Sequence, residues 1–112
     1  MSEDDRTSPR EFGVQVNDDG EGRTLVAVSG EVDVYTAPRL RDCLYDLIGD
    51  GKMQLVIDFA DMDFIDSTGL GVLVGALKRL RQAGGDLALR SPSRATYKIL
   101  EITGLTKVFT VE

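Results

Sequence analysis

The sequence predicts a single α/β domain with a mixed β-sheet, in the element order ββαβαβαβ. Segments with helical spacing alternate with short apolar runs, which is typical of a layered sheet and helices. A hairpin signal near the N-terminus adds an antiparallel pair to this parallel pattern. The length of 112 residues fits one domain, and each β–α–β step is expected to cross over right-handed.

The N-terminal part predicts a tail followed by a hairpin. Residues 1–11 are polar and charged and have no periodicity, so we expect a disordered tail before a domain at 12–112. Apolar and polar residues alternate over 12–16, which predicts a strand. The Asn, Asp and Gly residues at 17–22 predict a hairpin loop. The returning strand is expected over 25–28, ending at Gly30.

The middle of the chain predicts two helices around a buried strand. Thr36 is expected to cap a helix over 37–48, with a proline tolerated in its first turn. The continuous apolar run at 55–57 predicts a strand covered on both faces. Residues 58–66 are expected to form a connecting loop, and a second helix is expected from Ser67 to about residue 83.

The last third predicts a strand, a helix and a final strand. Residues 87–89 form a short apolar run. Ser91 followed by proline predicts a cap and the first position of a third helix, which Gly104 ends. The apolar residues within 108–111 predict the last strand.

Composition excludes several classes of function. The formal net charge is −6, which argues against nucleic-acid and anionic membrane surfaces, since both attract clustered Lys and Arg. No apolar stretch approaches the roughly 20 residues of a membrane span, and no secretory signal is visible, so a cytoplasmic location is expected. Cys43 is the only cysteine, and histidine is absent. The lack of histidine removes the usual general base and many zinc ligand sets, so we expect no catalytic residues, no metal and no cofactor.

The most informative segment is Asp66–Gly75, which joins a loop to a helix. Asp66, Ser67 and Thr68 can each accept hydrogen bonds from the first-turn N–H groups. Capping does not explain the three glycines in this segment, at 69, 71 and 75. A glycine inside a helix costs up to about 1 kcal/mol relative to alanine, so we expect the close approach of another backbone or of a partner.

One face of this helix is small and mildly apolar. On a helical wheel it consists of Thr68, Gly71, Val72, Gly75 and Ala76. This face predicts a shallow docking surface with Ser67 at its edge. The alternative is that a loop of the same chain covers it, and periodicity does not decide between the two.

Carboxylates also gather near this helix. Asp58, Asp61, Asp63 and Asp66 do not have the spacing of an EF-hand loop, so turn and cap roles are favoured over a metal site. The glycines do not form a phosphate-binding loop pattern either. Asp33 ends the segment Gly30-Glu31-Val32-Asp33, and we expect it to share one edge of the sheet with Ser67.

Three separated segments, 66–71, 30–37 and 102–109, resemble those of the anti-sigma factor antagonists, which have the STAS fold. The likeness covers nearly the whole chain after the tail, and it is greatest to actinobacterial members. It implies a mixed sheet with helices mainly on one face. Many members continue into a further helix, whereas the present sequence stops at Glu112, so the contribution of such a helix stays open.

The resemblance also implies a mechanism of partner switching. The unmodified protein binds an anti-sigma factor that is also a serine kinase, and a sigma factor is released. Phosphorylation of the serine after the motif aspartate, here Ser67, ends that binding, and a serine phosphatase restores it. Thr68 is the less favoured acceptor. The expected partner contacts are Asp33, Asp66, Ser67, Thr68, Gly69, Gly71, Val72 and Gly75. The alternative is a STAS module that senses a nucleotide or another small molecule.

Overall fold

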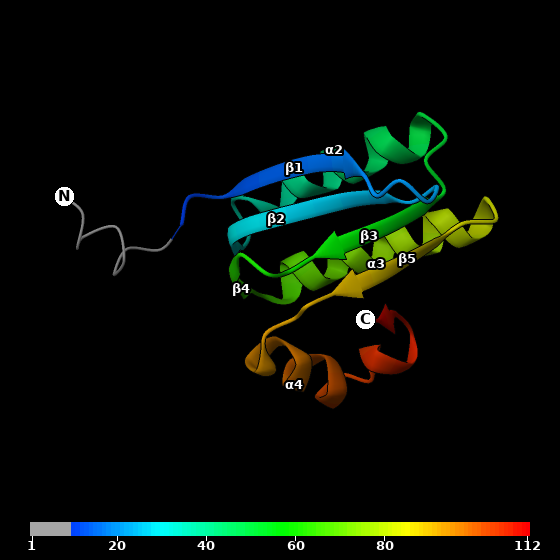
Figure 1. Ribbon diagram of the computed structural model, residues 1–112. Helices are drawn as coiled ribbons and strands as arrows, with labels where there is room; N and C mark the ends of the chain where they lie inside the picture. Colours follow the sequence, from blue (N-terminus) through cyan, green and yellow to red (C-terminus); the bar gives the residue numbers. More distant parts are fainter. Residues whose placement is uncertain (1–9) are drawn as a thin grey trace.

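The computed structural model describes residues 10–112 and has the predicted α/β architecture (Figure 1). The sheet has the strand order β1-β2-β3-β5-β6, and β4 pairs separately with β2. β1 (Gly13–Asp18) is antiparallel to β2 (Thr24–Val32), and the other strand pairs in the described residues are parallel. Figure 1 shows α2 and α3 behind the sheet and α4 beside its β5 side. The prediction of a mixed sheet is therefore confirmed.

The remaining elements alternate as expected, with small additions. The strands are β3 (Gln54–Asp58), β4 (Met62–Ile65), β5 (Asp86–Arg90) and β6 (Thr110–Val111). The helices are α2 (Ala37–Gly49), α3 (Ser67–Gln82) and α4 (Arg94–Ile102), and a 3-10 turn, η1 (Leu105–Lys107), precedes β6.

The core lies between the sheet and the two helices behind it. α2 contributes the fully buried Leu40 and Leu44, and α3 contributes a stripe of buried leucines that the 3.6-residue period predicted. The main sheet residues facing them are Val26, Val28, Leu55, Ile57, Leu87 and Leu89. α2 and α3 also pack against each other, which fixes the relative position of their first turns.

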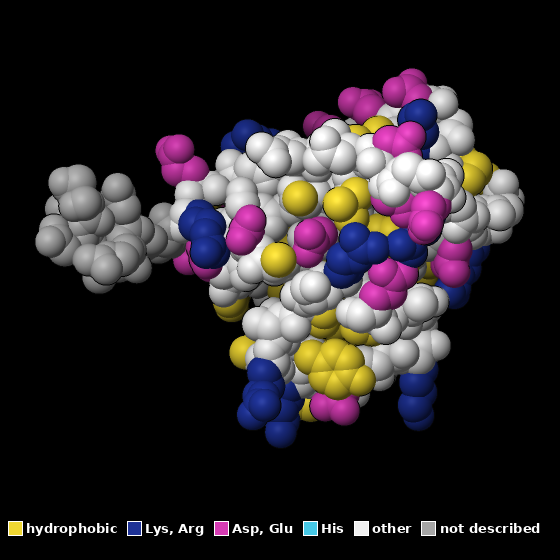
Figure 2. Space-filling model, viewed as in Figure 1, with side chains coloured by type: hydrophobic (Ala, Val, Ile, Leu, Met, Phe, Trp, Pro, Cys, Tyr) yellow, Lys and Arg dark blue, Asp and Glu magenta, His cyan; other side chains and the backbone are white. Residues whose placement is uncertain are grey.

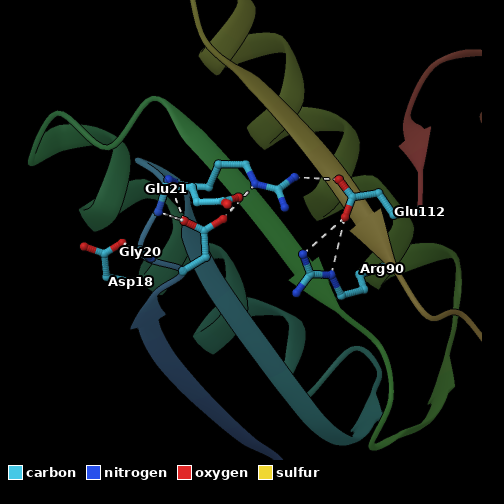
Figure 3. A network of polar contacts seen from close by, with 7 residues as sticks. Asp18, Gly20, Glu21, Arg90 and Glu112 are labelled. Atoms are coloured by element: carbon cyan, nitrogen blue, oxygen red, sulfur yellow. Dashed lines mark hydrogen bonds and ion pairs between the residues drawn. The ribbon is translucent and has the colours of Figure 1, made fainter.

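The other face of the sheet carries an ion network over β3 (Figure 3). Arg23, beside the hairpin, donates to Asp19 and Glu112, and Arg90 at the end of β5 also donates to Glu112. The Arg23 guanidinium holds the pKa of Asp19 and that of Glu112 below their ordinary values. Figure 2 shows acidic and basic side chains mixed across this face. Val56 of β3 is fully buried although it lies outside the helix-side core, so the prediction of a strand covered on both faces is confirmed.

Two predictions about the strands were wrong. Residues 58–66 contain β4, whose four residues are too few to show a strand pattern. β2 does not end at Gly30 but continues to Val32, because Gly30 adopts φ +80° and the register shifts there as the strand passes from β3 to β4. A bulge of this kind lets one strand pair with two partners in succession.

Two local expectations also need correction. Helix α4 begins at Arg94, not beside Ser91, because Ser91 has φ +56° and Ser93 is the cap that accepts from the Thr96 N–H. Thr36 occupies the cap position of α2 without bonding to the first turn through its side chain. Residues 1–9 of the expected tail lie outside the described residues. Arg10 is held by Asp63, through both its backbone N–H and its guanidinium.

Candidate functional site

Two strand-to-helix turns meet at the carboxyl ends of β2 and β4. Val32 pairs with Ile65, and the Asp66 N–H donates to the Val32 carbonyl at 3.0 Å. Asp33 directly follows Val32, and Ser67 directly follows Asp66. Asp33 and Ser67 therefore lie at the same edge of the sheet, as expected from the sequence. Helices α2 and α3 both start at this edge, where functional residues of α/β sheets usually gather.

Asp66, rather than Ser67, caps helix α3. The Asp66 carboxylate accepts from the Gly69 N–H at 3.1 Å, and Ser67 is the first helical residue. Ser67 was expected to act both as a cap and as a switch, and the first of these roles is corrected. The Ser67 side chain is exposed and makes no hydrogen bond within residues 10–112. Its hydroxyl is therefore accessible, and the local fold does not depend on it.

Asp33 organises the turn that precedes α2. Its carboxylate accepts from the N–H groups of Tyr35 and Thr36 at 2.9 and 3.0 Å. The Thr36 hydroxyl donates to the Glu31 carbonyl at 2.9 Å and accepts from the Asp33 N–H at 2.9 Å. Both bonds direct it toward the end of β2, which explains why it does not accept from the first turn of the helix. The hydrogen bonds from Thr36 and Tyr35 lower the pKa of Asp33 below its usual value, because they stabilise the charged form.

We expect Asp33→Ala to destabilise the protein near neutral pH and to have little effect in acid. A carboxylate with a lowered folded-state pKa stabilises the fold above its unfolded pKa, and this contribution is lost as the pH falls through the folded value. Urea denaturation at pH 7 and near pH 3 measures both unfolding free energies, with Asp50→Ala at the exposed end of α2 as the control. An equal loss at both pH values would contradict this role of the carboxylate.

The three glycines of α3 have different surroundings. A Cβ on Gly69 would lie 2.7 Å from side-chain carbons of both Val32 and Ile65, so the interior requires glycine there. A Cβ on Gly75 would lie 3.2 Å from the Tyr45 hydroxyl of α2. A Cβ on Gly71 would meet nothing within 4 Å, and Gly71 is exposed. Only Gly71 has no packing reason to lack a side chain, despite a helix-propensity cost of up to about 1 kcal/mol.

The small face of α3 is therefore narrower than predicted. Ala76 is fully buried, and Val72 is half-buried against the core. Gly75 is partly covered by Tyr45 of α2. The face is therefore neither fully open, as the prediction of a docking surface held, nor covered by a loop, as the alternative held. The part that remains exposed is the first turn and a half, with Ser67, Thr68 and Gly71.

The nearby aspartates have separate structural roles. Asp58 accepts from the Ala60 N–H, Asp63 pairs with Arg10, and Asp66 caps α3. Within residues 10–112 no three possible metal ligands converge. A groove of about 480 Å³, open to solvent, lies at the hairpin end of the sheet beside Arg23 and Lys52. It is remote from the edge that carries Ser67.

Sequence patterns missed two exposed apolar residues at this edge. Tyr35 is 85% exposed and Val34 is 59% exposed, both in the turn that Asp33 organises. Adjacent apolar residues before a helix are also typical of a buried turn, so only the structure reveals their exposure. Phe64 of β4 is half exposed too, but it alternates with the buried Ile65 and so faces the opposite side of the sheet.

Comparison with known proteins identifies the family. The STAS domain profile matches residues 14–112. The chain belongs to the STAS family. It is 41% identical over 86 residues to the anti-sigma-B factor antagonist of Bacillus subtilis, covering 77% of this chain and 78% of that protein. The crystal structure of an anti-sigma factor antagonist from Mycobacterium paratuberculosis matches with a TM-score of 0.82 and 32% identity, over 93% of this chain and 87% of the other. This neighbour supports the resemblance to actinobacterial members.

The Bacillus protein SpoIIAA shares the STAS fold in two chemical states. Its unphosphorylated form matches with a TM-score of 0.77, over 89% of this chain and 88% of the other. Its phosphorylated form matches with a TM-score of 0.71, over 89% and 91%. Identity is 22% in both cases, which makes this a likeness of fold. No helix within residues 10–112 of the present STAS protein is both long and apolar enough to cross a membrane.

Proposed function

We propose that this STAS protein is an anti-sigma factor antagonist that binds an anti-sigma factor with serine kinase activity, and that phosphorylation of Ser67 ends the binding. The observation that carries the proposal is the exposed Ser67 hydroxyl on a helix start that Asp66 already caps. A modification there leaves the hydrogen bonds of the fold in place. The names of the relatives support the class of partner.

Chemically, the antagonist supplies an acceptor and a surface, and its partner supplies the catalysis. The kinase transfers the γ-phosphoryl group of ATP to the Ser67 Oγ; the Oγ–P bond forms, ADP leaves, and the hydroxyl proton passes to a base of the kinase. A serine phosphatase hydrolyses the phosphoester and restores the binding form. All these steps take place in the cytoplasm. The fold of SpoIIAA in both forms supports a switch that leaves the STAS fold intact.

The added phosphate would act at the surface. It carries a charge of about −1.5 to −2 at pH 7, which the positive end of the α3 dipole tolerates. Asp33 and Asp66 already make this edge acidic. Phosphorylation therefore weakens the docking of any partner surface that complements the uncharged serine.

We expect incubation with the anti-sigma factor and ATP to add one phosphate at Ser67. Tryptic peptides spanning residues 67–68 are analysed by mass spectrometry, and Ser67→Ala serves as the acceptor control. Thr68→Ala is the matched variant, because Thr68 is the neighbouring exposed hydroxyl, and it should be labelled like the wild type. Full labelling of Ser67→Ala would rule out Ser67 as the acceptor.

A further inference from the structure

We propose that Tyr35 and Val34, together with Gly71 of α3, form the apolar anchor of the surface that receives the anti-sigma factor. The inference rests on the proposed function and adds the chemistry of the partner. The partner should present an apolar recess bordered by Arg or Lys side chains. None of the contacts predicted from the sequence included Tyr35 or Val34.

The first argument is exposure on a rigid support. Tyr35 is 85% exposed, yet its backbone N–H is held by the Asp33 carboxylate at 2.9 Å. The Asp33 N–H donates in turn to the Thr36 hydroxyl at 2.9 Å. These bonds hold the backbone of the turn in one conformation before any partner arrives, so the points from which the Val34 and Tyr35 side chains project are fixed. An ordered backbone reduces the entropy lost on binding, and tyrosine is enriched among the residues that dominate interfaces.

The second argument is continuity with the Ser67 edge. The Asp66 N–H donates to the Val32 carbonyl, which joins the turn before α2 to the start of α3. The two helices then pack against each other along the same face of the sheet. In Figure 1 both helices start at the same end of the sheet, beside β4. A partner that covers the Ser67 hydroxyl therefore reaches the turn that carries Tyr35.

The third argument is the unexplained glycine. Gly69 and Gly75 each face a neighbouring side chain, whereas a Cβ on Gly71 would enter open space. Gly71 is exposed and lies one helical turn after Ser67. Its missing side chain permits close approach of a partner backbone to the first turns of α3.

The acidic groups at this edge indicate which charged groups the partner carries. The half-buried carboxylates at this edge are Asp33 and Asp66, and the chain has a formal net charge of −6. An apolar centre beside acidic groups complements an apolar recess bordered by cationic groups. A phosphate on Ser67 would have to enter the recess itself, where the cost of desolvating its charge exceeds the attraction of the border. A second copy of this chain has the same acidic groups and would be repelled, so the occupant is a different protein.

The test measures the affinity of Tyr35→Ala for the purified anti-sigma factor by calorimetry. We expect a dissociation constant raised about thirtyfold, as for a residue that dominates an interface. Tyr35→Phe keeps the ring and should bind within about threefold of the wild type. Tyr97→Ala on α4 is the control, since Tyr97 is another tyrosine at the surface, 39% exposed, and it should bind like the wild type. Because Tyr35 is 85% exposed, the melting temperature of Tyr35→Ala should not change.

Gly71→Ala separates binding from folding. A better helix former at an open position should raise the melting temperature, while the added methyl group should weaken binding about tenfold if a partner backbone lies there. A glycine with a purely structural role would not give opposite changes in stability and affinity. If Gly71→Ala binds the anti-sigma factor as tightly as the wild type does, Gly71 is not part of the anchor.

Each outcome separates this inference from the proposed function. If the wild type does not bind the anti-sigma factor, both fail. If the wild type binds, Ser67→Asp does not, and Tyr35→Ala binds as the wild type does, only the anchor is wrong. Sedimentation velocity of the free protein tests self-association. A wild-type dimer that Tyr35→Ala dissociates would assign the surface to a second copy and overturn the inference.

Discussion

Ser67→Asp is expected to weaken binding to the anti-sigma factor by at least about tenfold, which corresponds to about 1.4 kcal/mol, while leaving the fold intact. The carboxylate places a negative charge beside Asp33 and Asp66, at an edge that has no need of the Ser67 side chain for capping. Bringing that charge into a contact costs desolvation as well as repulsion from any acidic group of the partner. Calorimetric titration of the anti-sigma factor measures the effect.

Two further variants separate charge from bulk at this position. Ser67→Ala removes only the hydroxyl and should bind as tightly as the wild type. Ser67→Asn has nearly the size of Ser67→Asp without its charge, so it should retain most of the affinity. An equal loss for Asn and Asp would show that bulk, not charge, operates the switch. The melting temperature of Ser67→Asp should stay the same or rise slightly, because a carboxylate near a helix N-terminus is stabilised by about 0.3–1 kcal/mol.

The sequence predicted the layers of the fold because its periodicity is strong. The leucine stripe of α3 and the apolar run of β3 each occupy the position expected from their pattern. It missed β4, whose four residues alternate irregularly between buried and exposed. A strand that short is defined by pairing with β2, and pairing between distant segments leaves no local signal.

The candidate site was only partly predictable for a related reason. Asp33 and Ser67 could be placed at one edge because carboxyl ends of parallel strands meet there. The glycines of α3 could be recognised as unusual, but one sequence does not reveal which has a neighbour. Gly69 faces the interior and Gly71 faces solvent, and that difference depends on the position of β2 and β4. The same geometry exposes Tyr35.

Gly30→Ala is expected to destabilise the protein by about 3 kcal/mol, lowering the melting temperature by roughly 12 °C or more. Gly30 has φ +80°, which costs a side-chain-bearing residue about 1 kcal/mol or more. An added Cβ would also lie 2.7 Å from the Arg10 carbonyl oxygen and 2.8 Å from backbone atoms of Glu11. Backbone atoms cannot rotate away as a side chain does, so the segment before β1 has to move.

Gly20→Ala is the matched control, because Gly20 has φ +81° but a Cβ there would meet nothing within 4 Å. Gly20→Ala should lower the free energy of unfolding by only about 1 kcal/mol, which is the cost of a positive φ for a residue with a side chain. The difference between the two variants, measured by urea denaturation, isolates the contact of Gly30 with Arg10 and Glu11. Gly30 also marks where β2 changes partner from β3 to β4, so a shift there should reach the Asp33 turn. Equal destabilisation by both substitutions would mean that the segment before β1 is not packed on Gly30.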